Sequence, residues 1–277
     1  MPERWMAIED AQQAAWRGFA ERLPKKARLL DLATGDARVP RWILAMRPDI
    51  VANAVDLAPQ LPPAPPGVTV QAGVAMEDLP FDDASFDAVV SQFGFEYGSV
   101  PETAAEIERV LAPGGIVGLM VHRGDGPILE FNVARRTQIE WVLREGNLIE
   151  AVKTAVDRGE AGLHDALTLA TDMAREGASK WGDGTPAWEI PEAVRRTLIL
   201  GGRGPRDKLL GTFDLIADQA RNDIGRIDSL AAACVTADDR DGLATAFQDV
   251  GMSLVDTLTV AEPSGRAFAD LLTLSRG

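Results

Sequence analysis

The sequence has little of what crosslinks a chain or carries it through a membrane. It contains one cysteine, Cys234, so no disulfide can form within the chain, and a reducing compartment is expected. No uninterrupted apolar run approaches the roughly 20 residues of a membrane span. The N-terminal segment, with Glu3, Arg4, Glu9 and Asp10, lacks the apolar centre of a signal peptide. We therefore expect a cytoplasmic protein without a membrane partner, in which Cys234 is a small buried residue.

Basic residues are scarce as well. The chain has 28 Lys and Arg against 42 Asp and Glu, which gives a formal net charge of -14. Because contacts with phosphates supply most of the non-specific affinity for nucleic acids, this balance disfavours a nucleic-acid partner. We expect a small-molecule substrate instead, and we predict no metal site.

Residues 124–236 show little strand character and no convincing repeat. Helical patterns are expected at 128–143, 148–157, 163–175, 191–200 and 208–227. Breaks are expected where glycine occurs, at Gly146, Gly159, Gly177 and 182–186. The simplest organisation is one sheet domain, formed by residues 1–123 and 237–277, with a helical insertion at 124–236 after the fifth strand.

The flanking segments contain a succession of short apolar runs, which are typical of buried strands. Seven strands are expected, starting at residues 28, 50, 68, 86, 116, 253 and 267. Helices are expected at 3–22, 40–46, 101–111 and 242–250, and the five prolines of residues 57–67 make a long helix there improbable. The pattern predicts an α/β fold with a doubly wound, mostly parallel sheet, closed by a hairpin after residue 253.

Two acids follow the first strands of this sheet, at the edge where open α/β sheets bind ligands. Asp31 ends a buried strand and needs a partner, which is either a ligand ammonium group or the small-residue turn 33–37. Asp56 follows the second strand directly. It is placed to accept hydrogen bonds from two ribose hydroxyls, or else it is a helix N-cap or a solvated turn residue.

The turn at residues 33–37 lacks the G-x-G-x-x-G spacing of nicotinamide cofactor sites. Asp36 would also place negative charge where a pyrophosphate must lie. A turn flanked by acids suits a ligand that carries positive charge. S-adenosylmethionine carries a sulfonium and an ammonium group, so the charges favour it.

Four motifs occur in order along residues 28–122. They are Leu30-Asp31-Leu32-Ala33-Thr34-Gly35, then Val55-Asp56, then Leu79-Pro80-Phe81 with Ser85-Phe86-Asp87-Ala88-Val89-Val90, and finally Arg109-Val110-Leu111-Ala112-Pro113-Gly114-Gly115. In this order they resemble class I S-adenosylmethionine-dependent methyltransferases, of the group that includes the ubiquinone and menaquinone C-methyltransferases. The resemblance implies a Rossmann-like fold and methyl transfer to a small or medium-sized metabolite. It also implies S-adenosylmethionine as cofactor, with S-adenosylhomocysteine as product.

The resemblance implies a set of cofactor-binding residues at the strand ends: Asp31, Ala33, Thr34, Gly35, Asp56, Leu57, Ala75, Met76, Gln92 and Phe93. Asp31 and the turn would hold the methionine part, and Asp56 the ribose. Ala75 and Met76 would flank the adenine, while Gln92 and Phe93 would line the pocket after the fourth strand.

Two positions depart from the family pattern. Ala37 stands where the family usually has its third glycine, and Ala75 stands where an acid often meets the adenine amino group. Glu77 substitutes for that acid only if the loop shifts. Because of these departures, the alternative stays open that this chain is a catalytically silent relative of the family. Such a relative would be a binding or assembly module that retained the sheet.

A general base is needed only if the atom that receives the methyl group must lose a proton. Candidates near the strand ends are Glu96, Tyr97 and His122, and each is alternatively a packed or solvated residue. His164 lies in a helical pattern and is expected to be structural.

Two helical regions have open roles. The amphipathic helix at 3–22 either docks on the domain through Trp5 and Trp16 or covers a cofactor as a lid. The insertion either caps the substrate pocket or forms a homodimer.

An NAD-dependent oxidoreductase is a distant alternative, because the phosphate-binding turn is missing. A nucleic-acid methyltransferase is also disfavoured, because the sequence lacks the Asn/Asp-Pro-Pro-Tyr/Phe motif of those enzymes.

Overall fold

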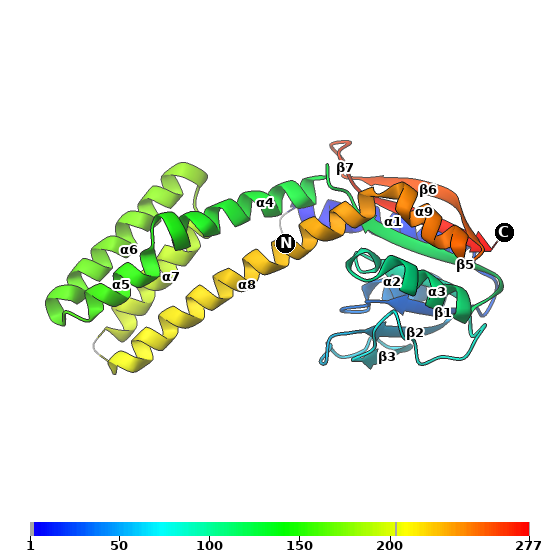
Figure 1. Cartoon of the computed structure of the whole chain (residues 1–277), viewed down its shortest axis with the longest axis horizontal. Helices are drawn as coiled ribbons and strands as arrows, with labels where there is room; N and C mark the ends of the chain where they lie inside the picture. The colour runs from blue at the N-terminus through cyan, green and yellow to red at the C-terminus, as the bar shows by residue number, and fades with distance from the viewer. Residues whose placement is uncertain (1–2, 203, 277) are drawn as a thin grey trace. The chain divides into compact units, whose positions relative to one another are not determined.

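The computed structural model describes residues 3–202 and 204–276, and Figure 1 shows the course of the chain. Contacts divide the chain into two compact units. The sheet unit comprises Met1–Leu129 and Leu230–Gly277, and the helical unit comprises Glu130–Ser229.

The sheet unit is built on one seven-stranded sheet with the order β3-β2-β1-β4-β5-β7-β6. Its strands are Arg28–Leu32 (β1), Val51–Asp56 (β2), Val68–Ala72 (β3), Phe86–Gln92 (β4), Leu111–His122 (β5), Met252–Ala261 (β6) and Ala267–Arg276 (β7). Strands β1 to β5 pair in parallel, whereas β7 is antiparallel to both β5 and β6. The predicted mostly parallel sheet with a closing hairpin is confirmed. The order of the parallel strands reverses between β1 and β4, which is the switch point where such sheets bind ligands.

Four helices of the sheet unit pack on the two faces of the sheet: α1 (Glu3–Glu21), α2 (Arg38–Met46), α3 (Val100–Val110) and α9 (Arg240–Asp249). All four were expected from the sequence. Successive residues of a buried strand alternate between the faces. Leu29 of β1 therefore packs in the layer with α1 and α2, while Leu30 and Leu32 pack in the layer with α3 and α9. Cys234 is buried, as expected.

Helix α1 is anchored on the sheet by aromatic side chains. Trp16 is fully buried and meets the ring of Phe19 edge to face, with the ring centroids 5.6 Å apart. A Cβ at Gly118 of β5 would come within 3.0 Å of the Phe19 ring, so glycine makes room for the helix. Trp16 thus docks α1 on the sheet unit. The side chain of Trp5 lies outside the described residues.

The fifth strand starts earlier than expected. Residues 112–115 were predicted to form a turn before a strand at 116, yet β5 already begins at Leu111, which pairs with Phe86. Ile116 then pairs with Ala88, so the pairing register shifts between the two positions. Gly114 adopts a φ of 79°, a value that favours glycine, and the proline and glycines form an irregularity inside the strand.

The described residues of the helical unit form parts or all of five α-helices and one π-helical turn. They are α4 (Pro127–Glu140), the π-helical turn η2 (Trp141–Glu145), α5 (Leu148–Val156), α6 (Glu160–Trp181), α7 (Pro186–Gly201) and α8 (Arg206–Asp238). The contacts change unit within α4 and α8, and the domain boundaries expected at 123/124 and 236/237 stay predictions. Among the described helices, none combines the length and apolar character needed to cross a membrane.

Two expectations for the helical unit are wrong. Helix α6 continues through Gly177, where a break was predicted, and α7 begins at Pro186 instead of at Pro191. Gly177 is buried, and a Cβ there would come within 3.0 Å of the carbonyl oxygen of Ala187. Proline has no backbone N–H, so Pro191 leaves that carbonyl without its helical donor. The glycine and the proline therefore permit a close approach of α6 and α7, and neither ends a helix.

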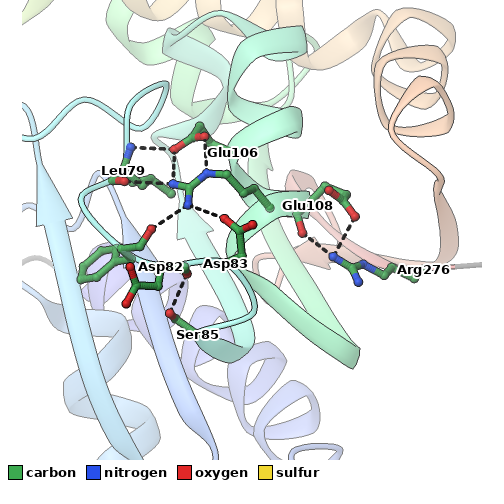
Figure 2. A network of polar contacts seen from close by, with 9 residues as sticks. Leu79, Asp82, Asp83, Ser85, Glu106, Glu108 and Arg276 are labelled. Carbon is green, nitrogen blue, oxygen red and sulfur yellow. Dashed lines mark hydrogen bonds and ion pairs between the residues drawn. The ribbon is translucent and has the colours of Figure 1, made fainter.

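Two of the motifs that carry the resemblance meet in one polar network, which Figure 2 shows around Leu79 and Glu106. Arg109 of α3 donates to the carbonyl oxygens of Leu79 at 2.9 Å and of Phe81 at 2.6 Å. The carboxylate of Glu106 accepts two hydrogen bonds from Arg109 and one from the Leu79 N–H, each at 2.7 Å. The Leu79-Pro80-Phe81 loop is therefore fixed to α3 by the arginine of the last motif.

We expect Arg109→Met to lower the free energy of unfolding by about 2–3 kcal/mol, because it removes the hydrogen bonds to the Leu79 and Phe81 carbonyls and the cationic partner of the Glu106 carboxylate. Urea unfolding measures the change. The matched control is Arg175→Met, which removes an exposed pair with Asp172 and is expected to change stability by less than about 0.5 kcal/mol. Equal effects of the two substitutions would contradict the structural role of Arg109.

Candidate functional site

Two cavities lie at the carboxyl ends of β1, β2 and β4, at the switch point of the sheet. The turn cavity, beside residues 33–39, has a volume of about 360 Å³, and the loop cavity, beside residues 74–77, about 380 Å³. Ala33 and Phe93 line both cavities, which together we call the crevice. All ten residues predicted to bind a cofactor line it: Asp31, Ala33, Thr34, Gly35, Asp56, Leu57, Ala75, Met76, Gln92 and Phe93. Their roles stay predictions.

The backbone around the crevice repeatedly adopts the left-handed conformation. The φ angles are 51° at Ala33, 56° at Gly35, 54° at Ala37 and 57° at Phe93. This region costs residues with a side chain about 1–2 kcal/mol, and such strain collects at functional sites. A Cβ at Gly94 would come within 3.0 Å of the Ala33 Cβ, so the loops after β1 and β4 are in close contact.

Ala37, at the position where the resemblance leads us to expect glycine, has a left-handed φ, which glycine adopts without steric strain. We expect Ala37→Gly to raise the free energy of unfolding by about 0.5–1 kcal/mol, because relief of the steric strain outweighs the added entropy of the unfolded chain. Ala45→Gly is the control, since Ala45 is exposed on α2 and its replacement should lower stability by about 1 kcal/mol. Thermal unfolding of both variants measures the difference. A loss of stability in both would show that position 37 carries no strain.

Asp31 is buried at the end of β1, with 2% of its surface exposed, and it lines the turn cavity. One carboxylate oxygen, Oδ2, accepts a hydrogen bond from the Thr34 hydroxyl. The other, Oδ1, has no hydrogen-bond partner in the described part of the chain. Burial raises the pKa of Asp31 to about 7; the Thr34 hydroxyl opposes this shift, and the charges of Asp56 and Asp36 add to it. A cationic group of a ligand would supply the missing partner of Asp31 Oδ1.

Asp56 forms hydrogen bonds to the loops that follow β1 and β2. Its Oδ2 accepts the backbone N–H of Gly35 and its Oδ1 accepts that of Ala58, each at 2.8 Å. The alternative that Asp56 is a helix N-cap is wrong, because the chain runs from β2 to β3 without a helix. A carboxylate has about four lone-pair sites, so each oxygen can accept a further hydrogen bond from a ligand.

The charge expected of Asp36 is balanced by a neighbour. Nε and Nη2 of Arg38 donate to the two oxygens of Asp36 at 2.9 Å and 3.0 Å. Partial burial disfavours the Asp36 carboxylate, but the hydrogen bonds and charge of Arg38 outweigh it and lower the pKa of Asp36. Arg38 therefore offsets part of the Asp36 charge, and the expectation that Asp36 disfavours a pyrophosphate stays a prediction. The acids that line the crevice are Asp31, Asp36, Asp56 and Glu77.

Glu77 also lines the loop cavity, and the sequence alone made its role depend on a shifted loop. Its Oε1 accepts the backbone N–H of Ser99 at 2.9 Å. A Cβ at Gly98 would come within 3.0 Å of this oxygen and of the Met76 side chain. The Gly98-Ser99 pair, which permits this approach, is the signal that sequence analysis missed.

Helix α1 contributes to the turn cavity through Gln92. The indole Nε1 of Trp16 donates to Oε1 of Gln92 at 2.6 Å, and Nε2 of Gln92 donates to Oε1 of Gln12 at 3.4 Å. Both polar ends of the Gln92 side chain are therefore held by α1. Gln12 was not singled out from the sequence, because an isolated glutamine in an amphipathic helix gives no signal.

The structure brings two of the three candidate catalytic residues into contact. Nδ1 of His122 lies 2.8 Å from Oε1 of Glu96, and the same oxygen accepts the backbone N–H of His122 at 3.0 Å. The His122 ring stacks on Phe93, with the ring centroids 4.1 Å apart. The third candidate, Tyr97, lines the loop cavity itself, and its ring meets that of His122 edge to face at 6.2 Å. His164 lies on α6 in the helical unit.

A third cavity, of about 470 Å³, lies within the helical unit. Two of its arginines, Arg135 and Arg226, share one carboxylate, Asp223, at 3.5 Å and 3.4 Å. Both arginines therefore already have an anionic partner, and this cavity is a weaker candidate for a ligand site than the crevice.

Comparison with known proteins bears on the sheet unit. Residues 30–119 match the family model described as "Methyltransferase domain". The demethylmenaquinone methyltransferase of Deinococcus radiodurans is 37% identical over an alignment of 103 residues, which covers 34% of this chain and 42% of that protein. An uncharacterised methyltransferase of Mycobacterium bovis is 34% identical over an alignment of 132 residues, which covers 46% of this chain and 49% of that protein. The chain thus spans less than half the length of these curated relatives.

Solved structures give a looser likeness. The 1,6-didemethyltoxoflavin-N1-methyltransferase of Burkholderia thailandensis aligns over 99% of this chain and 81% of its own, with 12% identity and a TM-score of 0.44. The fold assignment therefore rests on the strand order and pairing of this chain. Those features and the sequence match agree, and the chain contains a class I S-adenosylmethionine-dependent methyltransferase domain.

Proposed function

We propose that the sheet unit binds S-adenosylmethionine in the crevice and transfers its methyl group to a small or medium-sized metabolite. The observation that carries the proposal is the unpartnered, buried Oδ1 of Asp31 in the turn cavity. An unsatisfied buried carboxylate oxygen is costly unless a ligand completes its contacts. A cationic ammonium group does so.

The residues of the crevice fit this ligand part by part. Asp31 pairs with the ammonium group, and the turn 33–35 leaves room for the methionine chain beside it. Asp56 accepts hydrogen bonds from the ribose hydroxyls with its remaining lone pairs. Glu77, held by the Ser99 N–H, takes the place of the acid missing at Ala75 and faces the adenine. When bound, S-adenosylmethionine supplies an electrophilic methyl carbon, and the protein holds the acceptor in line with it.

The name of one relative, demethylmenaquinone methyltransferase, supports a small-molecule acceptor. The cap and homodimer roles of the helical insertion, the cytoplasmic location and the absence of a nucleic-acid partner stay predictions.

Calorimetry with S-adenosylmethionine and S-adenosylhomocysteine tests the proposal. We expect both compounds to bind with dissociation constants in the micromolar range. Transfer of a labelled methyl group from S-adenosylmethionine to a small-molecule extract then separates an enzyme from a silent binding module. Absence of binding by both compounds would contradict the proposal.

A further inference from the structure

We infer that Glu96 and His122 form a proton-accepting pair beside the crevice, in which Nε2 of His122 is the base and Glu96 is the residue that positions it. The inference rests on the proposed function and narrows its substrate class. It commits the acceptor to a group that loses a proton on methylation, such as a hydroxyl or an acidic carbon.

The first step of the argument is the tautomer of His122. Glu96 Oε1 lies 2.8 Å from Nδ1 and also accepts the backbone N–H of His122 at 3.0 Å. An ionised carboxylate only accepts hydrogen bonds, so it places the proton of a neutral imidazole on Nδ1. The lone pair is then on Nε2. A histidine fixed in this way is poised to accept a proton at the nitrogen that faces away from the carboxylate.

The second step is the incomplete set of contacts around Glu96. Its side chain is fully buried, and Oε2 has no hydrogen-bond partner in the described part of the chain. A carboxylate that served only to fasten β5 to the 3-10 helix η1 (Phe95–Tyr97) would be expected to have both oxygens paired. A proton that arrives at Nε2 would make the imidazole a cation in direct contact with this carboxylate.

The third step is the location of the imidazole. The ring of His122 is stacked on Phe93, which lines both cavities, and it meets the edge of Tyr97, which lines the loop cavity. Strands β4 and β5 are neighbours, with Gln92 paired to Met120, so His122 follows at the same edge of the sheet. The pair thus lies directly behind the wall of the crevice.

The other titratable groups near the pair come from α8 and from the loop after β5. From α8, Cys234 and Asp238 lie near the pair, and Asp238 accepts the Gly124 N–H at 3.1 Å. Burial, with the charges of Asp238 and Glu96, raises the pKa of Cys234 to about 12, so this thiol is neutral. From the loop after β5, Arg123 is already paired with Asp125 and Asp270. The groups contributed by α8 are therefore acidic or neutral.

The proton step balances without a further reactant. The acceptor loses one proton to Nε2 as its freed electron pair forms the bond to the methyl carbon. The bond from that carbon to sulfur breaks, and its electrons stay on sulfur. The pair is left as an imidazolium beside a carboxylate, which later returns the proton to solvent.

The chain has two histidines, which makes the pair directly observable. In the His164→Gln variant, which replaces an exposed residue of α6, His122 is the remaining histidine. Nitrogen-15 chemical shifts of its ring should show the Nδ1–H tautomer at about pH 8. Adding Glu96→Leu to this variant, which removes the acceptor oxygen beside Nδ1, should abolish that preference. A neutral His122 ring with its proton on Nε2 in the ligand-free protein would overturn the inference. This nitrogen-15 measurement requires no ligand.

A second arm tests whether Nε2 faces the methyl group. S-adenosylmethionine carries a positive sulfur that S-adenosylhomocysteine lacks, so it should lower the titration midpoint of His122 by about 0.5 pH unit or more relative to the product. Binding of both compounds in the calorimeter with equal midpoints would overturn the base role and leave the cofactor site intact. Absence of binding would overturn the proposed function, and the base role with it.

Discussion

Replacing Asp31 by asparagine is expected to weaken the binding of S-adenosylmethionine about 100-fold, or roughly 2.7 kcal/mol, because the variant removes the anion that would pair with the ammonium group. Calorimetry measures the loss. The control is Asp36→Asn in the same cavity, where Arg38 already balances the charge, and the expected change is less than about three-fold. Equal losses in the two variants would show that general negative charge, and not Asp31, holds the ligand.

The same variant should make the free protein more stable. Burial raises the pKa of Asp31 from 3.8 to about 7, so the folded state holds a proton that the unfolded state releases between these values. Stability of the wild-type protein therefore falls as the pH rises from about 4 to 7. At about 1.4 kcal/mol per pKa unit the loss reaches up to about 4 kcal/mol, and Asp31→Asn avoids it. Thermal unfolding at several pH values should show the advantage of the variant growing over this range.

Ligand affinity should follow the opposite trend. An ionised Asp31 is needed to pair with an ammonium group, so affinity for S-adenosylmethionine should rise as the pH approaches about 7. It should fall again above about pH 8, where α-amino groups lose their proton. In Asp31→Asn the rising part of the profile should be absent. A variant that is less stable than the wild type at about pH 8 would contradict this account of Asp31.

Gly177→Ala is expected to destabilise the helical unit by about 3 kcal/mol or more. The new Cβ would come within 3.0 Å of the Ala187 carbonyl, and this obstacle is backbone that cannot rotate away. Helices α6 and α7 would have to separate along their contact. The other buried positions of α6, which are Gly162, Ala166, Ala170 and Ala174, are equally small, so the whole face is built for close approach.

The chain offers a control of opposite sign. Gly225 is exposed on α8, and nothing lies within 4 Å of a Cβ placed there. Gly225→Ala should therefore raise the free energy of unfolding by about 0.5–1 kcal/mol, since alanine is the better helix former. Urea unfolding followed by circular dichroism compares the two variants. If Gly177→Ala also stabilised the protein, α6 and α7 would not be in close contact at this point.

The strands of the sheet could be predicted from the sequence because each is marked by residues that are close together in the chain. Each strand is a short apolar run, and the acids Asp31 and Asp56 directly follow or end such runs. In a parallel sheet this fixes the edge on which they lie. The ordered motifs along residues 28–122 then predicted which strands adjoin the crevice, and the structure places all ten implied residues along it.

What the sequence did not predict depends on contacts between distant residues. Glycine is selected both where a helix ends and where two helices touch, so Gly177 was misread. The Arg38 side chain folds back on Asp36 across two residues, which no periodic pattern reveals. Glu96 and His122 were separate candidates, and only the adjacency of β4 and β5 makes them a pair.

A crystal structure with S-adenosylhomocysteine tests the central claim most directly. The account predicts the amino group of the compound within hydrogen-bond distance of Asp31 and its ribose hydroxyls on Asp56, with the adenine beside Met76 and Glu77. A ligand bound elsewhere, or reversed so that the adenine lies against Asp31, would contradict it.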